Sequence, residues 1–221
     1  MTTSSPDRLR PEGRITALEA DSRRATSIRI HVGGHPYCTV PATVVAAERL
    51  QVGGEIDAAQ HERLCAAADA EAAFRTALRA LEARGYARTD LSRRLVRKGH
   101  PRAAVDAAME RAAGLGLLDD AAFARNYVET RSPRGRGPAR LARDLMAMGV
   151  ERRDIDAALA AHWPDGPGEV EVPLALVSRR AAQLAGLPPA VRRRRLLAYL
   201  ARRGYRGHGV SAVVARALAG G

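Results

Sequence analysis

Three copies of one spacing pattern constrain the fold of this chain more than any other feature of its sequence. Each copy has two leucines four residues apart, a glycine four residues later, and two apolar residues six and ten residues after the glycine. The copies are Leu91, Leu95, Gly99, Val105 and Met109; Leu141, Leu145, Gly149, Ile155 and Leu159; and Leu196, Leu200, Gly204, Val210 and Val214. Their intervals of 50 and 55 residues indicate an internal repeat.

The spacing predicts three helices in each copy. Leucines at i and i+4 form the buried stripe of one helix, the glycine can end it with a left-handed residue, and the branched residue six positions on begins the stripe of the next helix. In the first copy, His100 and Pro101 fit an N-cap followed by proline at the first helical position. An amphipathic helix precedes each copy, with apolar residues Phe74, Leu78 and Leu81; Phe123 and Tyr127; and Leu174 and Val177.

The remaining sequence divides around these repeats. We expect a disordered tail at 1–14, a small β-ribbon plus a short helix at 15–56, helical repeats at 57–115, 116–163 and 173–221, and a linker rich in Pro and Gly at 164–172. Gly33 and Gly34 suit a tight hairpin turn, a short helix runs from Pro41 to Arg49, and Asp57 is the expected N-cap of the long helix behind it. Residues 15–56 are too few to fold well alone, so they should pack on the helices. The predicted fold class is mainly α: a tandem array of three three-helix repeats, elongated and curved, with a small N-terminal β-ribbon extension.

Motifs and composition argue against several classes of protein. The longest stretch without charge, 30–47, contains two Pro, two Gly and two His, so no transmembrane helix is expected. The N-terminus has no apolar block, so we expect no secretory signal and a cytoplasmic protein. Phosphate loops, HExxH and CxxC are absent, and we expect Cys38 and Cys65 to be small buried hydrophobes with no base near them. We therefore predict no enzyme, no cofactor and no metal.

The distribution of charge is more informative than its total. Of 36 basic residues all but Lys98 are arginine, which is typical of a GC-rich genome and is not in itself evidence of phosphate recognition. Residues 172–221 contain ten arginines and no acid, whereas residues 1–171 contain 26 basic and 24 acidic residues. Of the net charge of +12, +10 therefore lies in the last fifty residues, which indicates a polyanionic partner.

Two arginine clusters are the candidate binding residues. Four consecutive arginines span about 300° of a helix and cannot all face one ligand, so a solvated surface is the alternative for the first cluster. Loop flexibility is the alternative for the second, which opens the middle helix of the second repeat. We predict polyanion binding by Arg192, Arg193, Arg194, Arg195, Arg202, Arg203 and Arg206 in the first, and by Arg131, Arg134, Arg136 and Arg140 in the second.

Three segments resemble one known family. They are residues 117–128 (LLDDAAFARNYV), residues 134–145 (RGRGPARLARDL) followed by Gly149 and Ile155, and residues 77–86 (ALRALEARGY) before Leu91. The chain resembles the RecX regulatory proteins, which modulate the RecA recombinase, over about residues 58–219. The resemblance implies a non-enzymatic regulator, expected as a monomer, that lies in the groove of the RecA–DNA filament. Its implied partners are the RecA filament and single- and double-stranded DNA, and its implied effect is inhibition of ATP hydrolysis, strand exchange and coprotease activity.

Two other classes stay open. Helix-turn-helix DNA readers also place a glycine four residues after a buried residue and a branched residue six positions later, which would make a DNA-binding transcription regulator. The residue four before that glycine is usually small, however, and here it is Leu95, Leu145 and Leu200. A generic repeat scaffold for some other acidic protein is the second class.

Overall fold

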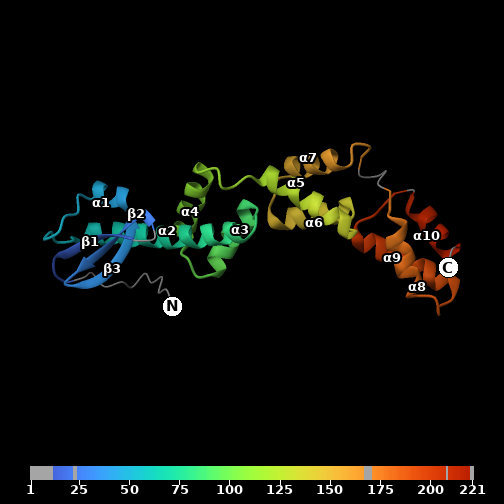
Figure 1. The fold of residues 1–221 in the computed structure, drawn as a ribbon, viewed down its shortest axis with the longest axis horizontal. Coiled ribbons are helices and arrows are strands. Elements are labelled where there is room, and N and C mark those ends of the chain that lie inside the picture. Colours follow the sequence, from blue (N-terminus) through green and yellow to red (C-terminus); the bar gives the residue numbers. More distant parts are fainter. Residues whose placement is uncertain (1–11, 22–23, 167–170, 208, 220–221) are drawn as a thin grey trace. The chain divides into compact units, whose positions relative to one another are not determined.

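A computed structural model describes residues 12–21, 24–166, 171–207 and 209–219 (Figure 1). The chain forms two compact units, one of Met1–Gly85 with Leu91–Leu118 and one of Tyr86–Asp90 with Asp119–Gly221. Most of the tail expected at 1–14, and residues 167–170 of the expected linker, lie outside the described residues.

The first unit begins with a three-stranded antiparallel sheet in the order β1-β2-β3 (Figure 1). Its strands are β1 (Ile15–Asp21), β2 (Arg24–Val32) and β3 (His35–Pro41). Gly33 and Gly34, with φ of 58° and 83°, join β2 to β3. Two successive positive φ angles give the turn a twist that matches the strands, which explains the glycine pair. The expected small N-terminal sheet is confirmed.

The sheet packs on the first long helix, as predicted. The short helix α1 (Ala42–Ala47) follows β3, and α2 (Ala58–Ala83) begins at Asp57, whose carboxylate accepts from the amide of Gln60 in a capping box. Ile30 and Val40 are fully buried in a cluster that also holds Leu64 of α2. Alternate strand residues and one stripe of α2 thus share a core that the strands could not form alone.

Farther along α2, a buried polar network ties the sheet to the first repeat. The Glu71 side chain is 3% exposed, and its carboxylate accepts from the Ser27 hydroxyl at 2.9 Å and from Nη1 of Arg111 at 2.8 Å. The Arg111 guanidinium also lies 4.0 Å above the centre of the Phe74 ring. The buried charge is therefore paired and hydrogen-bonded, as burial of a carboxylate requires.

Each repeat consists of three helices, as the spacing predicts. The first contains α2, α3 (Arg88–Arg97) and α4 (Arg102–Gly114). The second contains α5 (Asp120–Arg131), the 3-10 turn η1 (Ser132–Arg134), α6 (Pro138–Met148) and α7 (Arg152–His162). The third contains α8 (Leu174–Ala182), α9 (Pro189–Arg203) and α10 (Gly209–Ala219).

The five-position frame is the core of these repeats. All twelve apolar frame residues are at most 9% exposed. Gly99, Gly149 and Gly204 have φ of 88°, 83° and 89°, so each glycine ends the middle helix of its repeat in the left-handed conformation. The mainly helical fold is therefore confirmed, whereas the elongation, the curvature and the domain boundaries stay predictions.

Two local expectations are wrong. Helix α4 begins at Arg102 with Pro101 as its N-cap, and His100 instead lies with Nε2 3.0 Å from the Thr76 hydroxyl. Cys38 is buried, but Cys65 is only half-buried, with Sγ 3.8 Å from Nε2 of His61. The i, i+4 spacing on α2 brings this thiol to a base. In the part of the chain that is described, no helix is long and apolar enough to cross a membrane.

Candidate polyanion-binding site

The candidate site lies where the third repeat meets the second. The amide of Gly137 donates to the carbonyl of Arg203 at 2.7 Å, and the amide of Ala139 donates to the carbonyl of Gly204 at 3.2 Å. The first amides of a helix and its last carbonyls lack partners within that helix. The beginning of α6 and the end of α9 therefore satisfy each other, with their dipoles head to tail.

This joint has no room for side chains at its two glycines. A β-carbon on Gly137 would lie 2.7 Å from the carbonyl carbon of Gly204, and one on Gly204 would collide with the backbone nitrogen of Arg140. The left-handed glycine of the second repeat makes a similar approach, because a β-carbon on Gly149 would collide with the Thr89 side chain. Gly149 and Gly204 thus both end their helices and allow the preceding repeat to approach.

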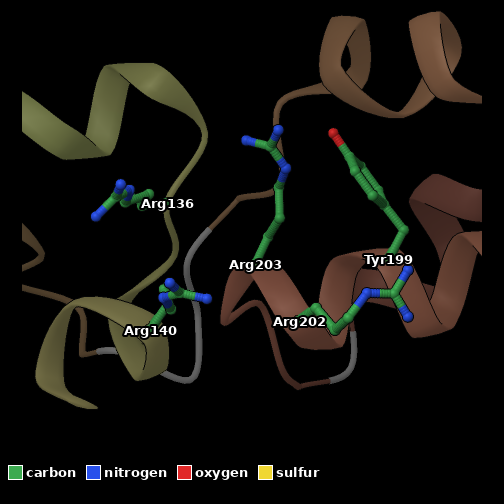
Figure 2. Close-up of a pocket in the computed structure, with 5 residues that line it drawn as sticks. All are labelled: Arg136, Arg140, Tyr199, Arg202 and Arg203. Atoms are coloured by element: carbon green, nitrogen blue, oxygen red, sulfur yellow. The ribbon is translucent and has the colours of Figure 1, made fainter. Parts of the chain in front are cut away.

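The joint brings arginines from both predicted clusters around one pocket of about 320 Å³. Figure 2 shows Arg136, just before α6, and Arg140, in its first turn, beside Tyr199, Arg202 and Arg203 of α9. The lining is therefore cationic on both sides, with a single aromatic ring. Pockets of this composition suit an anion that can accept several hydrogen bonds.

One carboxylate holds the α6 side of the pocket in place. Asp144 accepts from Nη1 of Arg136 and from Nε of Arg140, each at 2.9 Å. The Tyr127 hydroxyl accepts from Arg136 at 3.0 Å and donates to Asp144 at 3.4 Å. Burial, followed by the Asp144 charge, raises the pKa of Tyr127, so its phenol keeps the proton that it donates.

Arg203 is held by backbone atoms of the basic loop. Its Nη1 donates to the carbonyls of Arg134 at 2.9 Å and Gly135 at 3.1 Å, and its guanidinium lies 4.9 Å from the centre of the Tyr199 ring. Arg202 is exposed and makes no ion pair or hydrogen bond within the described residues. The pocket therefore contains four guanidinium groups and one nearby carboxylate, and it keeps an excess of positive charge.

The structure separates the remaining predicted arginines from this pocket. Arg131 lies over the Tyr127 ring at 5.4 Å, and Arg192 lines another cavity near the beginning of α9. Exposed positions outside the pocket lining are occupied by Arg134, Arg193, Arg194, Arg195 and Arg206. Only four of the eleven candidates are therefore brought together, and binding by any of them stays a prediction.

Three residues of the site escaped the sequence reasoning, which used arginine density alone. They are Tyr127, Asp144 and Tyr199. Helical spacing carried a signal for two of them, since Asp144 follows Arg140 by four residues and Tyr199 precedes Arg203 by four. No spacing rule connects Tyr127 with Arg136, because the turn η1 and the loop after it lie between them.

Comparisons with known proteins agree with the helical repeats. The family model for "RecX, second three-helix domain" matches residues 119–159, which span α5 to α7. The regulatory protein RecX of Halorhodospira halophila is 37% identical over 154 residues, which cover 69% of this chain and 92% of that protein. The protein of the same name from Streptomyces coelicolor is 38% identical over 143 residues, which cover 64% of this chain and 74% of that protein.

Solved structures show the same fold. A crystal structure of regulatory protein RecX matches with a TM-score of 0.69 over 92% of this chain and 98% of that one, at 24% identity. The crystal structure of RecX from Lactobacillus salivarius matches with a TM-score of 0.54 over 68% of this chain and 97% of that one, at 16% identity.

Proposed function

Because this chain belongs to the RecX family of regulatory proteins, we propose that it binds the filament that the RecA recombinase forms on DNA and inhibits RecA there. The inhibited activities are ATP hydrolysis, strand exchange and coprotease activity. The observation that carries the proposal is the similarity to the regulatory protein RecX of Halorhodospira halophila, of which this chain covers 92%. That relative is named a regulatory protein, so the proposed action is binding without catalysis.

The basic pocket supports contact with DNA in this filament. Planar guanidinium groups match the oxygens of a phosphate with paired hydrogen bonds, and phosphate contacts carry no sequence information. Arg202 and the outer edge of Arg140 are exposed at the pocket, whereas Asp144 and backbone carbonyls orient the other arginines. The pocket is thus proposed to hold a backbone phosphate of single- or double-stranded DNA whatever the sequence.

The function is tested by titrating the protein into RecA assembled on single-stranded DNA and measuring ATP hydrolysis. We expect the rate to fall with added protein, and we expect the protein without RecA to hydrolyse no ATP. An unchanged rate at saturating protein would overturn the proposal, and so would ATP hydrolysis by the purified protein alone.

The role of the pocket is tested with the double variant Arg140→Gln, Arg202→Gln. Its matched control is Arg97→Gln, Arg125→Gln, which removes the same charge from exposed positions outside the pocket. The pocket variant should bind DNA several-fold more weakly, and the slope of log K against log salt should flatten by up to about 0.9 for each lost phosphate contact. Equal losses in the two variants, with both folded, would mean that only net charge matters.

A further inference from the structure

A second cavity lies within the third repeat, away from the basic pocket. Its volume is about 630 Å³, in the range of pockets that hold ligands. Helices α8, α9 and α10 enclose it together with the turn after α8. Its lining is mainly small and apolar, with alanines and Leu174 beside Ser178, Arg192 and Arg216. This composition differs from that of the basic pocket, which has only arginines and one tyrosine.

Among the described residues, no carboxylate pairs with either arginine of this cavity. Residues 172–221 contain no acidic side chain, whereas in the earlier repeats Arg102, Arg140 and Arg152 each pair with an aspartate one helical turn away. Nε of Arg192 is buried and has no hydrogen-bond partner among the described residues. Since Nε is inaccessible to solvent, a ligand in the cavity would accept from the terminal nitrogens of Arg192, and no acceptor among the described residues competes for them.

The lining selects the chemistry of the ligand. Alanines allow another polypeptide backbone to approach closely, and their methyl groups contact apolar side chains. A nucleic-acid backbone has a charged phosphate at every nucleotide and therefore offers little that such an apolar lining can bind. Two guanidinium groups beside an apolar floor fit a carboxylate that is flanked by apolar residues. Charge and apolar surface together therefore favour a segment of a protein over DNA.

We propose that this cavity binds an acidic, apolar segment of the protein partner, with a carboxylate on Arg192 and Arg216 and its apolar neighbours on the alanines. The inference rests on the proposed function, because RecA in the filament is the partner in question. Arg192 and Arg203 are eleven residues apart on α9, so the two sites are separated by about 16 Å along the helix. The chain would then contact protein through one site and DNA through the other.

The first experiment fills the cavity without changing charge. Ala182→Trp adds bulk at an exposed alanine of the lining, and the control Ala215→Trp adds it at an exposed alanine of α10 outside the lining. Affinity is measured for the RecA filament on single-stranded DNA and for the same DNA alone, with circular dichroism to verify folding. We expect Ala182→Trp to weaken filament binding about tenfold and DNA binding less than twofold, with Ala215→Trp near the unmodified protein in both.

The outcomes separate this inference from the proposed function. If the unmodified protein does not bind the filament, the proposed function fails. If it binds and the two tryptophan variants bind the filament equally, the cavity is not the contact. If Ala182→Trp weakens binding to the filament and to naked DNA equally, the cavity binds nucleic acid and the inference is overturned.

A second experiment identifies the ligand group. Arg192→Lys keeps the positive charge and supplies an amine, which a water-soluble carbodiimide couples to carboxylates as an amide but does not couple to phosphodiesters. We expect a cross-link to RecA through residue 192, identified by mass spectrometry. The control Arg193→Lys, at an exposed neighbour, should yield at most a tenth as much. Equal yields from both positions would contradict a carboxylate held in the cavity.

Discussion

Replacing Gly204 with alanine tests how the second and third repeats are joined. Gly204 has φ of 89°, a conformation that costs an alanine about 1–2 kcal/mol, and its β-carbon would also collide with Arg140. Gly99 occupies the same position of the first repeat with φ of 88°, and a β-carbon there would meet nothing within 4 Å. Gly99→Ala therefore has the conformational cost alone, and the difference between the variants isolates the joint.

The expected difference follows from the two hydrogen bonds at the joint. To relieve the collision, the end of α9 must move away from α6, which breaks the bonds from the amides of Gly137 and Ala139. Each such bond contributes about 0.5–1.5 kcal/mol, so the joint loses about 2 kcal/mol. Since 1.4 kcal/mol corresponds to a factor of about ten, the joint should open about thirtyfold more often in Gly204→Ala.

Amide hydrogen exchange measures this opening locally, without assuming that the repeats unfold together. In Gly204→Ala the amides of Gly137 and Ala139 should exchange about thirtyfold faster than in the unmodified protein. In Gly99→Ala their exchange rates should not change. If both variants leave these rates within about threefold of each other, the contact between the helix ends does not stabilise the joint, and our explanation of the glycine is wrong.

Three further predictions concern stability. Leu145→Ala removes a fully buried side chain and should lower the free energy of unfolding by about 2–5 kcal/mol in a urea titration, whereas a loss below about 0.5 kcal/mol would place the residue at the surface. Glu71→Ala should lower the free energy of unfolding by about 1–3 kcal/mol. This is less than the loss of a fully buried ion pair, because the Arg111 side chain is 38% exposed. An equal loss in Glu71→Gln would contradict a contribution from the ion pair. Burial lowers the pKa of His100 below its usual 6.5. As the pH falls, His100 therefore becomes protonated in the unfolded chain before it does in the folded protein. The contribution of His100 to stability is then complete above about pH 6.5 and is lost as the pH falls below that value. His100→Gln should reduce the pH dependence of the thermal unfolding temperature. An unchanged pH dependence in this variant would contradict the burial of His100 as its cause.

Local features of the fold were predictable because their causes lie within a few residues. The stripe of Leu141 and Leu145 and the glycine after it produce a helix and its left-handed end without help from distant residues. The turn at Gly33 and Gly34 and the cap at Asp57 followed in the same way. His100 was misplaced because both it and Pro101 can precede a helix, and packing against Thr76 decided between them.

The candidate site was predictable only as an excess of charge. Arginine density selected the two segments that meet at the pocket, but it could not separate Arg136 and Arg140 from their neighbours Arg131 and Arg134. It also missed Asp144, which orients both Arg136 and Arg140. A count of charges contains no information on which side chains are already paired within the fold.

The sequence by itself determined that this chain repeats a three-helix unit, where the middle helices end, and that positive charge gathers in the last repeat. Only the tertiary structure decided that the end of α9 docks on the beginning of α6, so that Arg203 reaches the carbonyl of Arg134 and a shared basic pocket forms. The physical reason is the distance along the chain over which the deciding interactions act. Helices and their caps depend on neighbours within one or two turns, whereas a pocket between two repeats depends on the contact of helix ends from distant parts of the chain.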